Sequence, residues 1–137
     1  MARPRVALAS RPVPESPTQF TEKSLKLVRD LVTEAVAACC DLPALARGKV
    51  VLVKPNLVRP DPRNPCAVVT DERVLLAVVG LLRDAGAARV LVGDNPGYGL
   101  SLFEALACMA DFTRRVAAAG GEIVSFDHCG SEAVPNP

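Results

Sequence analysis

A lysine closes a short apolar run in the stretch "VVLVKPN", residues 50–56. An ammonium group in apolar surroundings must be paired with a negative charge or lose its proton. Lys54 could therefore hold a carboxylate or phosphate of a ligand, or act as a base. It could equally form a structural ion pair with Asp94, which ends the later apolar run "RVLVGDN". Lys54 and Asp94 are the candidate catalytic residues.

The residues beside this pair suit substrate binding. Pro55 has no N–H to donate, so it ends strand pairing and lets Asn56 turn its amide toward a ligand. An amide both donates and accepts hydrogen bonds, although Asn56 could instead cap the following turn. Asp94 has no second acid close in sequence, so we predict no metal site here.

The rest of the chain alternates between strand and helix patterns. Strand-type runs are "VALA" (6–9), "KVVLV" (49–53), "RVLVGDN" (89–95) and "EIVSF" (122–126). Helical spacing begins at Thr21 and closes near Cys40. A second helix is expected from an N-cap at Thr70 to Gly86, and a third from the capping box "SLFE" (101–104) to Ala119.

This order, βαβαβαβ, predicts a three-layer α/β fold of Rossmann-like type with a mostly parallel sheet and helices on both of its faces. We expect residues 1–137 to form a single α/β domain. Because the sequence stops just after a strand, we also expect a truncated or partial domain with an uncovered edge or face.

Ligands of open α/β sheets bind beyond the carboxyl ends of the strands, where the strand order reverses. All four predicted strands end on polar residues, which is the pattern of a shared site. These residues are Ser10 and Arg11, Lys54 and Asn56, Asp94 and Asn95, and Asp127 and His128.

Two other features could form sites. The loop "GDNPGYGLS" precedes a helix N-terminus and could bind an anion, but it has neither glycine-rich phosphate motif and could be an ordinary turn. Cys66 is the cysteine nearest the predicted crevice and could be a reactive thiol. His128 and Cys129 are adjacent on an extended segment and point to opposite faces, which disfavours a nucleophile pair.

Composition excludes several classes of function. The formal net charge is +1 and there are five Phe and Tyr residues with no Trp, so a nucleic acid partner is not expected. The five cysteines contain no C-x-x-C pair, which favours reduced thiols in the cytoplasm over a disulfide framework or a cluster site. No segment reaches the length of a membrane span, and no signal peptide is evident.

The stretches "VVLVKPNLV", "AVVTDERVLLAVVGLLRDAGA" and "RVLVGDNPG" together resemble the family called domain of unknown function 362 (DUF 362). The resemblance extends from about Lys49 to Asp127. It implies substrate-binding roles for Asn56, Thr70, Asn95 and Gly97 beside Lys54 and Asp94. Asp71 and Asn95 replace the His and Ser that are commoner in the family.

The resemblance implies a redox-linked enzyme that binds a polar small molecule. Family members are often longer and carry a ferredoxin-like module with iron–sulfur clusters. This chain lacks the necessary cysteine run, so we expect no cofactor in it and a cluster only on a missing or partner module. The alternatives are a non-catalytic ligand-binding or assembly domain, or the remnant of a split protein whose C-terminal half is another chain.

Overall fold

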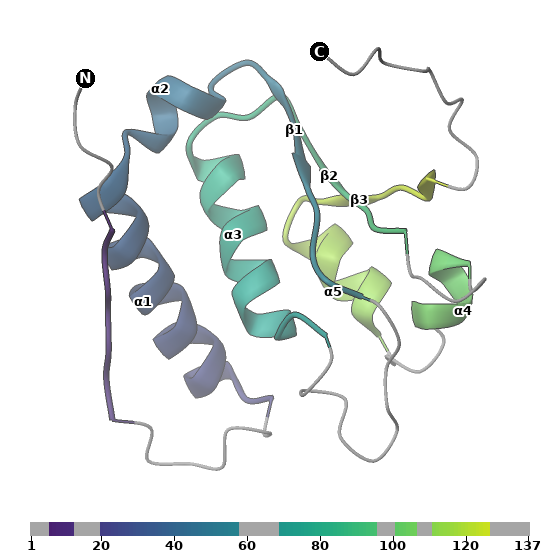
Figure 1. Ribbon diagram of the computed structural model, residues 1–137, viewed down its shortest axis with the longest axis horizontal. Coiled ribbons are helices and arrows are strands. Elements are labelled where there is room, and N and C mark those ends of the chain that lie inside the picture. Colours follow the sequence, from purple (N-terminus) through teal and green to yellow (C-terminus); the bar gives the residue numbers. More distant parts are fainter. Residues whose placement is uncertain (1–5, 13–19, 58–68, 96–100, 107–110, 127–137) are drawn as a thin grey trace, which may run out of the picture.

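The computed structural model describes residues 6–12, 20–57, 69–95, 101–106 and 111–126. Helices and strands alternate along most of these ranges, as Figure 1 shows. In chain order the elements are α1 (Glu22–Cys39), α2 (Leu42–Ala46), β1 (Val50–Val53), α3 (Glu72–Asp84), β2 (Arg89–Val92), α4 (Leu102–Leu106), α5 (Phe112–Ala118) and β3 (Glu122–Ile123).

The three strands form one parallel sheet in the order β1-β2-β3. Val53 lies opposite Val92, and Val92 lies opposite Ile123. The predicted α/β class and parallel pairing are therefore confirmed. In the described sheet the strands follow chain order, so this part of the fold has no reversal of strand order to form the predicted crevice.

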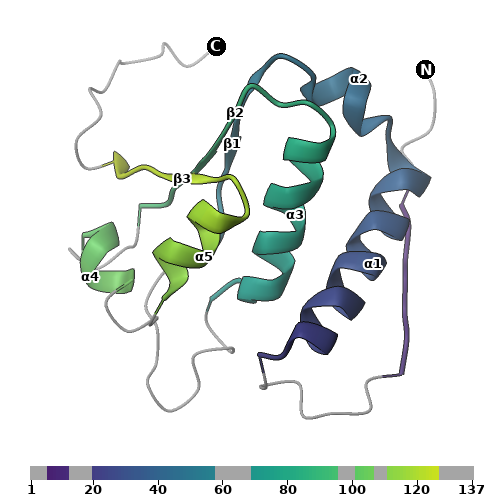
Figure 2. The same cartoon turned by 180° about the vertical axis from the view of Figure 1, so that it is seen from behind.

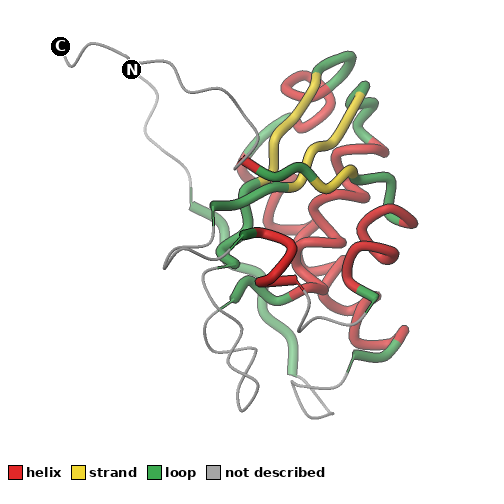
Figure 3. Tube along the Cα trace, turned by 90° about the vertical axis from the view of Figure 1, so that its right-hand side faces the viewer, coloured by secondary structure: helices red, strands yellow, loops and turns green. Residues whose placement is uncertain are grey.

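Helices α1, α3 and α5 lie on the same side of the sheet (Figure 3). Helix α3 packs on β2, α5 packs on β3, and α1 packs on α3 as an outer layer. The predicted arrangement with helices on both faces is not seen in these residues. Val50 and Leu52, on the opposite face of β1, are 57% and 51% exposed. Their apolar character misled the sequence analysis, because a covered strand and a half-exposed one can share the same residues.

The predicted strand at residues 6–9 is wrong. Val6 and Leu8 are 95% and 93% exposed, and the segment has no strand structure. It runs beside α1 on the side away from α3 (Figures 1 and 2), where Arg11 pairs with Glu34 of α1 at 2.7 Å. An apolar run of four residues becomes a strand only if a sheet edge accepts its hydrogen bonds, and this segment lies away from the sheet.

The first predicted helix is confirmed, with Thr21 as the N-cap of α1 and Cys40 as its C-cap. The third is wrong in part, since α4 and α5 replace one helix. Asp111 has φ of 64°, in the left-handed region, so a right-handed helix cannot continue through it. Helix α2, which begins with Leu42 and Pro43, was not predicted.

The core lies between the inner face of the sheet and helices α3 and α5. Its central residues are fully buried: Leu75 and Val79 on α3, Val90 and Val92 on β2, and Phe112 and Val116 on α5. This packing fixes β1 and β2 against α3 and so fixes the place where both strands end. In the described part of the chain, no helix is long and apolar enough to cross a membrane.

Candidate functional site

Lys54 and Asp94 meet at the carboxyl ends of β1 and β2. The Lys54 Nζ atom lies 2.5 Å from Asp94 Oδ1, so the predicted ion pair is confirmed. The expectation of a buried ammonium is wrong, because the Lys54 side chain is 61% exposed and that of Asp94 only 1%. The buried charge is the carboxylate, and Lys54 brings a solvated positive charge to it.

Gly93 positions Asp94 by letting three chain segments approach closely. Its N–H donates to the Val53 carbonyl at 3.1 Å, and the Val124 N–H donates to the Val92 carbonyl at 2.9 Å. A Cβ on Gly93 would lie 2.6 Å from the Val124 carbonyl oxygen, closer than real Cβ atoms come. Because Gly93 has no side chain, the three segments can stay paired as far as Asp94.

The second oxygen of Asp94 holds the turn after β1. Its Oδ2 accepts a hydrogen bond of 2.7 Å from the N–H of Leu57, a residue that is itself 1% exposed. Oδ1 is buried, and its ion-pair partner is the Lys54 ammonium. One carboxylate thus ties the ends of two strands to the chain that follows β1.

Opposing effects set the pKa of Asp94. Burial on its own would raise the pKa of this carboxyl, but the Lys54 ammonium and the backbone N–H groups of Leu57 and Asn95 outweigh it. The net result is a pKa below the ordinary value, so Asp94 is ionised at neutral pH. A carboxylate in this state can fix a cation or accept a hydrogen bond, but it has no proton to donate.

Two hydrogen bonds join Asn56 and Thr70. The Asn56 N–H donates to Thr70 Oγ1 and the Thr70 N–H donates to the Asn56 carbonyl, both at 2.8 Å. The side chain of Asn56 is exposed, as that of Asn95 is. These bonds bring the start of α3 to the end of β1, beside Lys54.

Thr70 is not the N-cap of α3, contrary to the sequence prediction. Asp71 takes this place, because its Oδ1 accepts a hydrogen bond of 2.8 Å from the Arg73 N–H. The guanidinium of Arg73 also bonds this carboxylate and, as the largest cause, lowers the pKa of Asp71. The Thr70 hydroxyl does not cap the helix and instead accepts the hydrogen bond from the Asn56 N–H.

The other candidates divide into two groups. Gly97, Cys66, Asp127, His128 and Cys129 lie outside the described residues. Ser10 and Arg11 were expected at the shared site, but Arg11 pairs with Glu34 on α1 instead. The described residues contain no group of three or more His, Cys, Asp or Glu side chains placed to hold a metal ion.

The arrangement can hold an anion. An ammonium group has three N–H donors, and Asp94 faces only one side of that of Lys54. The exposed side can receive a carboxylate or phosphate, and the exposed Asn56 and Asn95 lie next to the two charged residues in the chain. This chemistry is binding and charge stabilisation.

Together the fold and the site define an α/β domain with a polar site at the carboxyl ends of adjacent parallel strands. A model of the family described as domain of unknown function (DUF362) matches residues 51–137, and the chain belongs to that family. The match begins within β1 and includes Lys54, Asn56, Thr70 and Asp94. No curated protein and no solved structure gives a significant match.

Proposed function

We propose that this DUF362 domain binds a small polar molecule with a carboxylate or phosphate group at Lys54. The observation that carries the proposal is the ion pair of an exposed ammonium with a buried, ionised carboxylate at adjacent strand ends. Asp94 keeps Lys54 in place and partly neutralises it, while Asn56, Asn95, Thr70 and Gly97 contribute hydrogen bonds to the ligand.

We further propose that the ligand is the substrate of a redox-linked enzyme in the cytoplasm. Its iron–sulfur cluster belongs to a ferredoxin-like module or C-terminal half on another chain. Lys54 and Asn56 hold or polarise the substrate, and Asp94 orients Lys54 or handles a proton. Support comes from the family resemblance. The five cysteines of the sequence contain no C-x-x-C pair, which is in keeping with a reducing compartment.

Ligand titration of matched lysine variants tests the binding proposal. Inorganic phosphate and malonate are titrated into the wild type, Lys54→Gln and Lys49→Gln, with amide chemical shifts and melting temperature as readouts. Lys49 is exposed and lies just before the opposite end of β1, so it controls for general charge. We expect saturable shifts near residues 54–57 and 94–95 in the wild type and Lys49→Gln, weakened about tenfold or more in Lys54→Gln.

Equal weakening in both variants would show unspecific charge attraction and overturn the proposal. The absence of any saturable response in the wild type would also overturn it.

A non-catalytic assembly domain is the second candidate. The exposed Val50 and Leu52 on the open face of the sheet favour it, because parallel sheets are almost always covered on both faces. On this interpretation Lys54 and Asp94 form a structural ion pair.

A further inference from the structure

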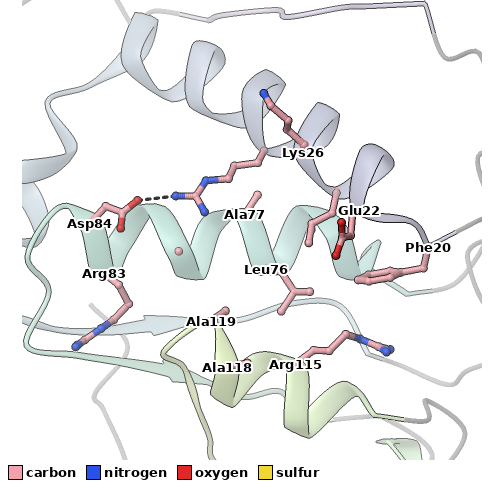
Figure 4. A pocket seen from close by; sticks show the side chains of 13 residues that line it. Phe20, Glu22, Lys26, Leu76, Ala77, Arg83, Asp84, Arg115, Ala118 and Ala119 are labelled. Atoms are coloured by element: carbon pink, nitrogen blue, oxygen red, sulfur yellow. Dashed lines mark hydrogen bonds and ion pairs between the residues drawn. The ribbon is translucent and has the colours of Figure 1, made fainter.

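A groove separate from the strand-end site runs along α3, between α1 and α5 (Figure 4). Its volume is about 620 Å³. Small-molecule sites typically enclose about 300–1,000 Å³, so the groove has the size of a ligand site. No sequence motif marks this groove, because its lining residues come from three segments far apart in the chain.

The floor of the groove is apolar and built from small residues. Leu76, Ala77 and Gly80 come from α3, and Ala118 and Ala119 come from the end of α5. Figure 4 shows Leu76, Ala118 and Ala119 between the facing helices, with charged side chains toward both ends. An apolar body would therefore lie in the middle, with polar groups available at its ends.

Gly80 leaves this floor open, although the packing around position 80 does not require a glycine. A glycine inside a helix costs about 1 kcal/mol relative to alanine. A Cβ at position 80 would lie 3.6 Å from Arg29 Nη1, its nearest neighbour, which is an ordinary contact. The backbone there is not in the left-handed region either, so neither strain nor crowding explains the glycine.

Arg29, Arg83 and Asp84 line the end of the groove near the last turn of α3. Arg29 pairs with Asp84 at 2.7 Å, the contact dashed in Figure 4, and its Nη1 lies over Gly80. Arg83 donates to the carbonyls of Ala87 and Ala88 and has no carboxylate in ion-pair distance among the described residues. Arg83 points away from the Arg29–Asp84 pair in Figure 4, so Arg29 is the cation that faces this end of the groove. Its guanidinium has five N–H donors, and the bond to Asp84 uses one on Nη2, so the donors on Nη1 over Gly80 can receive an anion.

At the opposite end the arginine is engaged more fully than Arg29. Arg115 is held by Glu72 through two hydrogen bonds of 2.5 and 2.9 Å, and its guanidinium lies over the ring of Phe20 at 4.6 Å. Glu22 adds a further negative charge to the lining. An anionic group is thus favoured at the Arg29 end and an apolar one toward Phe20.

We propose that this groove binds a small amphiphilic anion, with its carboxylate at Arg29 beside the last turn of α3 and its apolar chain running over Gly80, Ala77 and Leu76 toward Phe20. Between Leu76 and Asp84 a helix rises about 12 Å. A chain of roughly eight to ten carbons spans that distance. The ligand class is therefore a medium-chain carboxylate, and the site is independent of Lys54 and Asp94.

Titration with octanoate tests the proposal, with butyrate and 1-octanol as probes lacking the long chain or the charge. Arg29→Gln removes the head-group contact, and Gly80→Leu fills the floor. Lys26→Gln is the matched control, because Lys26 is also a cation of α1 that lines the groove but is paired with Asp30. Circular dichroism and melting temperature verify that every variant is folded.

We expect saturable amide shifts at residues 76–80 and 118–119 with octanoate. Affinity falls about tenfold or more in Arg29→Gln and Gly80→Leu, and less than about twofold in Lys26→Gln. Binding to butyrate or 1-octanol equal to that of octanoate would overturn the assignment, as would equal losses in Arg29→Gln and Lys26→Gln. Self-association that Gly80→Leu abolishes, without octanoate binding, would show a second copy of the chain as the occupant and also overturn it.

Discussion

At the scale of single residues, the charge that matters most is Asp94. Its side chain is 1% exposed, and it joins Lys54, the turn at Leu57 and the end of β2. Lys54 attracts attention in the sequence because a lysine interrupts an apolar run. In the folded chain the Lys54 side chain reaches solvent and the Asp94 side chain stays buried. Asp94 therefore stabilises the fold, and Lys54 is accessible to a ligand.

The depressed pKa of Asp94 predicts a specific dependence of stability on pH. In the unfolded chain this pKa returns to about its ordinary value of 3.8. A group whose pKa is lower in the folded state stabilises the fold above the unfolded pKa, and the stabilisation is lost as pH falls through the folded pKa. Asp94→Asn removes this contribution and weakens the bond to Leu57, at a cost of about 1–3 kcal/mol at neutral pH.

Urea unfolding of the wild type and Asp94→Asn between neutral and strongly acidic pH measures this effect. The difference in free energy of unfolding should stay constant at neutral pH and shrink below about pH 4. Asp30→Asn, which removes an exposed pair with Lys26, should change stability by less than about 1 kcal/mol throughout. A difference for Asp94→Asn that grows as pH falls would contradict the assigned pKa shift.

At the scale of helices and strands, the sequence predicted elements better than their ends. Apolar spacing located α1, α3, β1 and β2, because each buries one face against a neighbour. Apolar spacing could not show that Asp71, and not Thr70, is the N-cap of α3, because both residue types are good N-caps. The Thr70 hydroxyl is engaged by Asn56, which is distant in sequence. Tertiary contacts therefore determine which of the two residues caps the helix.

The same limit applies to the site. The pairing of Lys54 with Asp94 was predicted because parallel strands bring their carboxyl ends to one edge of the sheet. Which of the two would be buried depends on β3 and the segment after it, which approach Gly93 and lie far away in sequence. The helix groove escaped the sequence analysis for a similar reason, because Arg29, Gly80 and Ala118 show no common pattern.

Two glycines of different elements should respond oppositely to alanine. In Gly93→Ala the new Cβ would be 2.6 Å from the Val124 carbonyl oxygen, so β2 and the chain after β3 must separate. We expect a loss of about 2–4 kcal/mol in the free energy of unfolding. Gly80→Ala meets its nearest atom at 3.6 Å and should gain about 0.5–1 kcal/mol from helix propensity.

Equilibrium urea unfolding of both variants gives the comparison. Gly93→Ala with unchanged stability would mean that the close approach of Val124 to β2 does not form in solution.

At the scale of the whole molecule, the fold is asymmetric across its sheet. Helices α3 and α5 cover one face, and α1 adds a layer on α3, whereas β1 shows Val50 and Leu52 on the other face (Figure 3). Parallel sheets are almost always covered on both faces, and contiguous exposed apolar surface promotes association. This face is therefore the place where the two candidate functions give different expectations.

Replacing both apolar residues by threonine separates these expectations. Val50→Thr with Leu52→Thr places a β-branched side chain suited to a strand at both positions, and both are more than half exposed, so stability should change by less than about 1 kcal/mol. If the open face is an assembly surface, the double variant loses concentration-dependent light scattering and binding of a hydrophobic dye, while the amide shifts caused by phosphate at Lys54 persist.

Val51→Thr, on the inner face of β1 that packs against the core, is the contrasting control and should reduce stability. An unfolded double variant would show that the outer face belongs to the core, and unchanged scattering would show that these residues do not drive association.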